Sequence, residues 1–264
     1  MKLAFFLLSG VSVAMNAPLR MIRPIVWTCL VCLGSVSQAE SPNGYPDFNW
    51  DTVPVAFHFG KDGSAMTAEE AKFVASRSNL ICLEKGHAGE QFEYTEDGIE
   101  REARQLKRYN PNMKVIFYWN TFLDYPMFRA HEEYQRHPEW WLKTLSGKLD
   151  KKNGNLMRYD LSNAEVRAWW TDVVQTAVVS GTCDGVFMDA FPQIVADANK
   201  TRWGQKKYDA IQQGLVDTIK ETRAKIGANK LIFYNGIRST ARGQIGGEFT
   251  QDTDAAMIEH FGHF

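Results

Sequence analysis

The sequence predicts an α/β fold, specifically an incomplete (β/α)8 barrel with about six β/α units. Short apolar runs of strand length alternate with amphipathic helical segments, which is typical of parallel β/α units. Several of these runs end on a carboxylate or an amide, as strands do at the carboxyl-terminal mouth of a barrel. The chain has 264 residues, 44% of them hydrophobic and 23% charged, which allows one large domain with a sizeable core.

Six apolar runs are expected to be the strands of the sheet, because they are short and bounded by polar or turn residues. They are Val53–Phe59, Leu80–Glu84, Val115–Asn120, the run Val186–Met188 that leads into Asp189, Leu231–Asn235 and Ala255–Glu259. A closed barrel needs about eight strands. The sequence is therefore expected to be a fragment that stops after its sixth strand, with exposed edges at Val53–Phe59 and Ala255–Phe261 and poor stability.

Helices are expected between these strands, where capping residues precede apolar positions at helical spacing. The predicted starts and spans are a capping box at Thr67–Glu70 with a helix to about Ser76, a cap at Thr95 with a helix that ends before Asn110, a second capping box at Ser162–Glu165, and a helix over Gln205–Ile226. The aromatic-rich insertion from Thr121 to Leu156 is expected to form short helices over the mouth.

The N-terminus has the pattern of an export signal. A short basic start at Met21–Pro24 is followed by the apolar run Ile25–Val36 and by small residues before a cleavage site after Ala39. Residues 1–39 are therefore assigned to the signal peptide region, with a true start at Met15 or Met21, residues 40–52 to a lead-in, and residues 53–264 to a partial catalytic barrel. This predicts a secreted or periplasmic protein with no stable membrane anchor after cleavage. A retained membrane anchor is the alternative.

Charge and cysteine usage narrow the function classes. A formal net charge of -1 gives no electrostatic case for nucleic acid binding. Cys82 and Cys183 would remain after signal cleavage, in or beside core strands, and their redox state is open. No metal or organic cofactor is expected: metal-dependent barrel hydrolases carry His-x-His on their first strand, but His58 has Ala56 and Gly60 at those spacings.

Polar side chains at the predicted strand ends would converge on one face of a parallel barrel. They are His58, Glu84, Trp119, Asn120, Asp189, Asn235, Glu259 and His260. Cleavage of a glycosidic bond needs such a set: one carboxyl group protonates the leaving oxygen, and another acts as nucleophile or activates water. Amides hold sugar hydroxyls, and aromatic faces stack on sugar rings.

Asp189 and Glu259 are predicted to be the catalytic pair, because they end the fourth and sixth strands. Asp189 is assigned as nucleophile or base and Glu259 as general acid, although the roles could be reversed. Glu259 could instead be a salt-bridged structural carboxylate, and Glu84 is a rival acid unless Lys85 neutralises it. The residues assigned to substrate binding are His58, Glu84, Trp119, Asn120, Asp160, Asn235 and His260. Asp160 could instead cap the helix that follows it.

The segment from Asp160 to Trp170, followed by Asp184–Asp189, resembles the signature of TIM-barrel glycoside hydrolases. These include the hypothetical glycosyl hydrolase families and the endo-polygalactosaminidase-like proteins. The similarity covers roughly Val53 to Phe261, and it is poorly specific for substrate. The resemblance implies an exported enzyme that acts on a polysaccharide, with a carboxylate at Asp189.

The sequence thus predicts an exported glycoside hydrolase that cleaves a poly- or oligosaccharide by paired-carboxylate catalysis. The alternative is a non-catalytic carbohydrate-binding or surface protein on a decayed barrel. In both cases the expected partner is a carbohydrate. The sugar, the linkage, the stereochemical outcome and the oligomeric state are left open.

Overall fold

The computed structural model describes Tyr45, Asp51 and residues 53–240 and 243–259. The predicted signal peptide region, most of the lead-in and the predicted site residue His260 lie outside these residues. Within the described part of the chain, no helix is both long enough and apolar enough to cross a bilayer.

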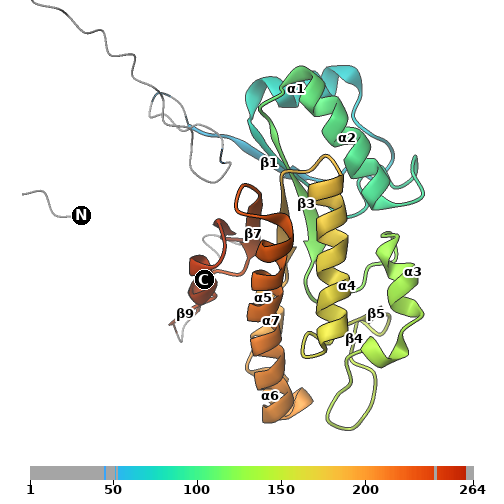
Figure 1. Ribbon diagram of the computed structural model, residues 1–264, viewed down its shortest axis with the longest axis vertical. Coiled ribbons are helices and arrows are strands. Elements are labelled where there is room, and N and C mark those ends of the chain that lie inside the picture. The colour runs from blue at the N-terminus through green and yellow to red at the C-terminus, as the bar shows by residue number, and fades with distance from the viewer. Residues whose placement is uncertain (1–44, 46–50, 52, 241–242, 260–264) are drawn as a thin grey trace, which may run out of the picture. The chain divides into compact units, whose positions relative to one another are not determined.

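Six parallel strands form one sheet in which neighbours in space follow the order of the sequence (Figure 1). They are β1 (Ala56–Phe59), β2 (Leu80–Leu83), β3 (Lys114–Asn120), β6 (Gly185–Asp189), β7 (Leu231–Asn235) and β10 (Ala255–Met257). The connections from β1 to β7 each pass through at least one α-helix. This arrangement confirms the predicted incomplete (β/α) barrel, although β1 begins later and β10 ends earlier than the apolar runs suggested.

Four longer helices accompany the sheet: α1 (Ala68–Arg77), α2 (Thr95–Tyr109), α4 (Ala164–Gln175) and α7 (Gln205–Ile226). The bounds of α7 are those predicted. The capping box of α1 is also confirmed, since the Thr67 hydroxyl accepts from the Glu70 N–H at 3.2 Å and the Glu70 carboxylate accepts from the Thr67 N–H at 2.7 Å.

Two predicted caps are wrong. Thr95 is the first residue of α2 rather than its cap, and its hydroxyl accepts from the Gly86 N–H at 3.0 Å, which ties the helix to the loop after β2. Asn163 rather than Ser162 caps α4, accepting from the Glu165 N–H at 2.9 Å. A side chain has several backbone donors within reach near a helix start, so the pattern alone does not decide between neighbouring candidates.

Shorter elements complete the described chain. They are α3 (Ala130–Gln135), α5 (Phe191–Ile194), α6 (Ala198–Trp203), a π-helical turn (Thr176–Ser180), 3-10 helices (Pro138–Trp140 and Gly247–Gln251), and two antiparallel pairs, β4 (Lys151–Lys152) with β5 (Leu156–Met157) and β8 (Arg238–Thr240) with β9 (Gly243–Ile245).

The insertion from Thr121 adds aromatic side chains to the hydrophobic core. Phe128 and Tyr134 are fully buried, and Trp140 is nearly so. Their rings pack on one another and on Trp119 and Trp169, with the Trp119 and Phe128 centroids 4.8 Å apart. Most of the aromatic residues of the insertion therefore stabilise its fold rather than form a sugar-stacking surface.

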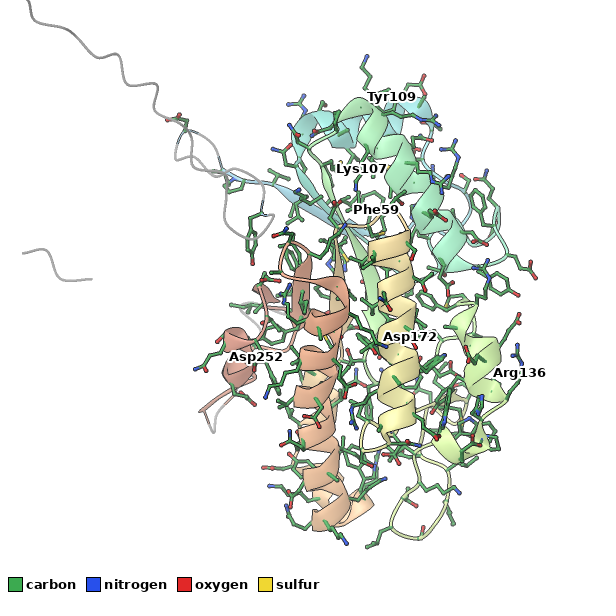
Figure 2. All side chains as sticks on the ribbon, in the orientation of Figure 1. Phe59, Lys107, Tyr109, Arg136, Asp172 and Asp252 are labelled. Carbon is green, nitrogen blue, oxygen red and sulfur yellow. The ribbon has the colours of Figure 1, made fainter. Side chains whose placement is uncertain are left out.

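Two carboxylates that precede strands each accept from the N–H of the second residue of the neighbouring strand. Asp184, before β6, accepts from the Val115 N–H at 2.9 Å and pairs with Lys107 of α2 at 2.7 Å; Figure 2 labels Lys107. Asp254, before β10, accepts from the Ile232 N–H at 2.7 Å in the same way. These bonds fix the register of the sheet at the end opposite the strand-end polar residues.

A close approach between α7 and the loop before α4 depends on Gly214. A Cβ atom at this position would lie 2.0 Å from the carbonyl oxygen of Leu161. We therefore expect Gly214→Ala to lower the free energy of unfolding by about 1–3 kcal/mol, because overpacking outweighs the better helix propensity of alanine.

Urea denaturation followed by circular dichroism measures the effect. The matched control is Gln213→Ala, at an exposed position of the same helix. A midpoint for Gly214→Ala equal to or above that of the unsubstituted chain would show that the two segments separate easily.

Candidate functional site

The site centres on Asp189, the last residue of β6. Parallel pairing aligns Asp189 with Asn120 on β3, and the strand register places Asn235 at the same level on β7. The next residue, Ala190, has φ 79° and ψ 17°, which is left-handed backbone that a residue with a Cβ atom rarely adopts. Such strain costs on the order of 1 kcal/mol. It persists only where the surrounding structure fixes the backbone, which is common at functional sites.

Four donors hold the Asp189 carboxylate. Its Oδ2 accepts from the Tyr118 hydroxyl at 2.5 Å and from Asn120 Nδ2 at 3.2 Å. Its Oδ1 accepts from the Ala190 N–H at 2.7 Å and from Asn235 Nδ2 at 3.0 Å. Hydrogen bonds to the charged form stabilise a carboxylate. The four bonds fix the orientation of the carboxylate, which is only partly buried.

Tyr118 is a buried donor to the Asp189 carboxylate. Its side chain is 1% exposed, and its hydroxyl also accepts from Asn120 Nδ2 at 3.1 Å. Burial and the negative charge of Asp189 raise the pKa of the Tyr118 phenol far above its ordinary value. The phenol therefore keeps its proton and remains a donor to the carboxylate.

Asn235 joins the two predicted catalytic carboxylates. Its Nδ2 donates to Asp189 Oδ1 at 3.0 Å and to Glu259 Oε2 at 2.8 Å. Because both bonds start at one nitrogen, these two oxygens can be no farther apart than the sum of the two lengths. Glu259 follows β10 by two residues and is partly exposed.

A second group of charged residues lies at the ends of β1 and β2. Glu84 Oε1 lies 2.6 Å from His58 Nε2, and Glu84 Oε2 accepts from Lys85 Nζ at 2.6 Å. The Lys85 ammonium lies over the ring of Tyr118, 4.6 Å from its centroid, and 5.8 Å from that of Tyr125. One tyrosine side chain thus separates this group from Asp189.

Both members of the Glu84–Lys85 pair are held in their charged forms. Burial alone would raise the pKa of Glu84, but hydrogen bonds from His58 and Lys85 and the charge of Lys85 lower it overall. Burial alone would lower the pKa of Lys85, but the hydrogen bond and charge of Glu84, with smaller contributions from Tyr125 and Asp189, raise it overall.

The structure brings together most of the predicted site residues and sets two apart. His58, Glu84, Asn120, Asp189, Asn235 and Glu259 belong to one connected network through Lys85 and Tyr118. Asn120 is 1% exposed, and its Oδ1 accepts from the N–H groups of Phe122 and Leu123. It therefore orients Asp189 and the loop after β3 rather than presenting itself to a ligand.

Trp119 does not belong to the site. It is 1% exposed, and its ring packs against Trp169 and Trp170 of α4, with centroids 5.9 and 6.3 Å away. Side chains alternate between the two faces of a strand, so Trp119 faces the helices while Tyr118 and Asn120 face Asp189.

Asp160 also lies elsewhere. Its Oδ2 pairs with Lys207 of α7 at 2.5 Å, and its Oδ1 accepts from the Ser162 hydroxyl at 2.6 Å. It thus ties the loop before α4 to the start of α7.

Tyr118 was not among the predicted site residues, although the sequence carried a signal for it. It stands two positions before Asn120, and residues two apart share a face of a strand. For Lys85, the sequence predicted only that it could neutralise Glu84. Its position over two tyrosine rings depends on contacts between separate segments, which no local pattern shows.

The cysteines and the acidic residues do not form a metal site in the described part of the chain. No group of three or more His, Cys, Asp or Glu side chains is placed there to hold a metal ion. Cys82 and Cys183 are both free thiols and buried. Burial raises the pKa of Cys183 to about 12, which keeps it protonated and unreactive at neutral pH.

The parallel sheet, with helices between its strands, defines the class as an incomplete (β/α) barrel. Residues 107–264, more than half of the chain, match the model of Hypothetical glycosyl hydrolase family 15. The chain belongs to this family. No curated protein matches it.

The matches among solved structures have low sequence identity. A cycloisomaltooligosaccharide glucanotransferase from Paenibacillus, solved with cycloisomaltoheptaose, superposes with a TM-score of 0.54 at 14% identity, over 78% of this chain and 34% of that one. A GH36 α-galactosidase from Geobacillus stearothermophilus gives a TM-score of 0.47 at 13% identity, over 67% of this chain and 27% of that one. The chain thus spans about a quarter to a third of the length of these two proteins.

Proposed function

We propose that this chain provides the catalytic site of an exported glycoside hydrolase that acts on a poly- or oligosaccharide. Family membership supports the reaction class. The observation that carries the mechanism is the Asn235 amide that bonds both Asp189 and Glu259. Export is proposed from the N-terminal sequence pattern, and no cofactor is assigned.

The separation of the two carboxylates favours a retaining reaction. The two bonds to Asn235 Nδ2, at 3.0 and 2.8 Å, bound the distance between Asp189 Oδ1 and Glu259 Oε2 below the range typical of inverting pairs, about 6.5–9.5 Å. They permit the distance of about 5–5.5 Å that is typical of retaining pairs. An upper bound this short on one oxygen pair favours direct attack by a carboxylate over attack by a water held between the two groups.

In this mechanism, Asp189 attacks the anomeric carbon while Glu259 gives its proton to the departing glycosidic oxygen. Water then attacks the glycosyl ester, Glu259 takes a proton from that water, and the Asp189 carboxylate is released. The four donors around Asp189 position the nucleophile before the substrate arrives.

The test is to incubate the protein with a panel of aryl glycosides and oligosaccharides of both anomeric configurations. The first-formed sugar is followed by ¹H NMR before mutarotation. Release of a sugar with the configuration of the substrate is expected. An inverted product would overturn the retaining mechanism, and carbohydrate binding without release would favour the non-catalytic alternative.

Tyr118→Phe is expected to lower kcat/KM by about 10–100-fold, because a charge-assisted hydrogen bond to the nucleophile contributes about 1.5–3 kcal/mol. The phenylalanine ring can still pack beneath Lys85.

Steady-state kinetics with the best substrate measure the effect. Tyr109→Phe, at an exposed position of α2, is the matched control and should leave kcat/KM unchanged. An unchanged kcat/KM in Tyr118→Phe would show that the Tyr118 hydroxyl does not contribute to the reaction.

A further inference from the structure

The charged group at the ends of β1 and β2 has no part in the proton transfers assigned to Asp189 and Glu259. It consists of His58, Glu84 and Lys85, whose side chains are 24%, 21% and 35% exposed. The residues that hold Asp189 from beneath, Tyr118 and Asn120, are each 1% exposed. The charged side chains are therefore accessible to solvent beside the site, whereas Tyr118 and Asn120 are not.

Stability does not account for this group. Partly exposed ion pairs contribute little to folding stability, because solvent screens them and two long side chains lose rotamer freedom. Lys85 also gives up hydration to lie over Tyr118 and beside Tyr125. A fixed ammonium beside a fixed carboxylate at a binding surface is better explained by a ligand that uses both.

The hydrogen-bonding capacity of the pair matches a diol. An ammonium has three donors, and the bond to Glu84 uses one of them. Each Glu84 oxygen has a second lone pair beyond its bond to His58 or Lys85. Neighbouring hydroxyl groups on a sugar ring both donate and accept, so one can accept from Lys85 while the next donates to Glu84.

The order of the strands orients such a ring. Along the sheet, β2 with Glu84 lies on one side of Asp189, and β7 and β10, which carry Asn235 and Glu259, lie on the other. A general acid must reach the glycosidic oxygen, so the leaving group extends toward β10. The ring whose anomeric carbon faces Asp189 then extends toward β2.

We infer that Lys85 and Glu84, braced by His58, form a subsite for two adjacent hydroxyl groups of a neutral sugar ring on the glycone side of Asp189. The ring is neutral because the paired charges cancel, and a charged sugar would meet a like charge at one of them. The orientation rests on the proposed function, whereas hydroxyl binding by the pair does not.

The test measures binding rather than turnover. Methyl α- and β-pyranosides of glucose, galactose, mannose and xylose are titrated by saturation-transfer NMR against the full chain and Lys85→Met. The ligand that binds best is then compared with each of its monodeoxy analogues. Lys72→Met, at an exposed position of α1, is the matched control.

Lys85→Met is expected to weaken binding by about tenfold or more, as for loss of a charge-assisted hydrogen bond. One monodeoxy analogue should bind the unsubstituted chain and Lys85→Met equally weakly, which identifies the hydroxyl that contacts Lys85. Exchange of the methyl aglycone for benzyl should change binding equally in both proteins, as expected for a subsite on the glycone side.

Equal binding of all ligands by Lys85→Met and the unsubstituted chain would overturn the inference. So would a uniform loss across every monodeoxy analogue, or no binding of any pyranoside. If Lys85→Met weakens binding and one monodeoxy analogue binds both proteins equally, but no sugar is hydrolysed, the proposed catalysis is refuted and the subsite is supported. Hydrolysis that Lys85→Met does not affect would refute the subsite and leave the catalysis standing.

Discussion

Asp189→Ala is expected to lower kcat for glycoside hydrolysis by about 10⁴-fold or more, equivalent to about 5 kcal/mol of transition-state stabilisation. The substitution removes the atom that would attack the anomeric carbon. It also removes the acceptor of the Tyr118 hydroxyl and one of the two acceptors of each of the Asn120 and Asn235 amides. Release of nitrophenol from the best aryl glycoside measures the loss.

Azide separates a nucleophile from a residue that only shapes the site. The truncated side chain leaves space beneath the anomeric carbon, and azide can attack there in a single displacement while the aryl leaving group departs. The expected product is a glycosyl azide of inverted configuration. Asp172→Ala, on the exposed face of α4 (Figure 2), is the control and should keep full activity.

Two outcomes would contradict the assignment. Near-normal hydrolysis by Asp189→Ala would remove this residue from the reaction. A glycosyl azide of retained configuration would mean that Asp189 is the acid/base and that the two roles are reversed. Circular dichroism and the urea midpoint establish that the variant is folded before either result is interpreted.

Glu259→Ala is expected to lower kcat by about 10²–10⁴-fold for substrates with a sugar or alkyl leaving group, the usual contribution of a general acid. For a dinitrophenyl glycoside, the leaving group departs without a proton, so formation of the glycosyl ester should be slowed far less. Stopped-flow release of dinitrophenol and the rate with an alkyl glycoside give this contrast.

Azide again identifies the role, this time with the opposite outcome. In Glu259→Ala it attacks the ester already formed on Asp189, so two displacements yield a glycosyl azide of retained configuration. Glu69→Ala, exposed at the start of α1, is the control. Equal losses for dinitrophenyl and alkyl substrates would indicate that Glu259 acts only through its bond to Asn235.

The sequence predicted those features that depend on residues close together in the chain, such as strands and helices. Apolar runs located the six strands, and helical spacing located α7 over Gln205–Ile226. Parallel pairing alone implied that Asn120, Asp189 and Asn235 would meet, because each ends a strand of the same sheet. The convergence of the candidate site could therefore be predicted without coordinates.

The remaining features depend on interactions that local patterns do not contain. Asp160 forms an ion pair with Lys207, which lies 47 residues later in the chain. Trp119 was predicted to lie in the site because it is next to last in β3. Side chains alternate along the strand, so it faces the helices instead. Tyr118, one position earlier on the correct face, was missed because it is not among the last two residues of β3. Asn163 rather than Ser162 caps α4, and the Ser162 hydroxyl instead donates to Asp160 and accepts from Lys207.

The contrast in burial between the two groups around Asp189 bears on how such a protein can change over evolutionary time. The residues that fix the reactive carboxylate, Tyr118 and Asn120, are almost sealed from solvent, whereas His58, Glu84 and Lys85 are open to it. Substitutions in the open group leave the buried hydrogen bonds intact. New preferences among sugars can thus arise by substitution at the ends of β1 and β2, while the residues that hold Asp189 are inherited unchanged.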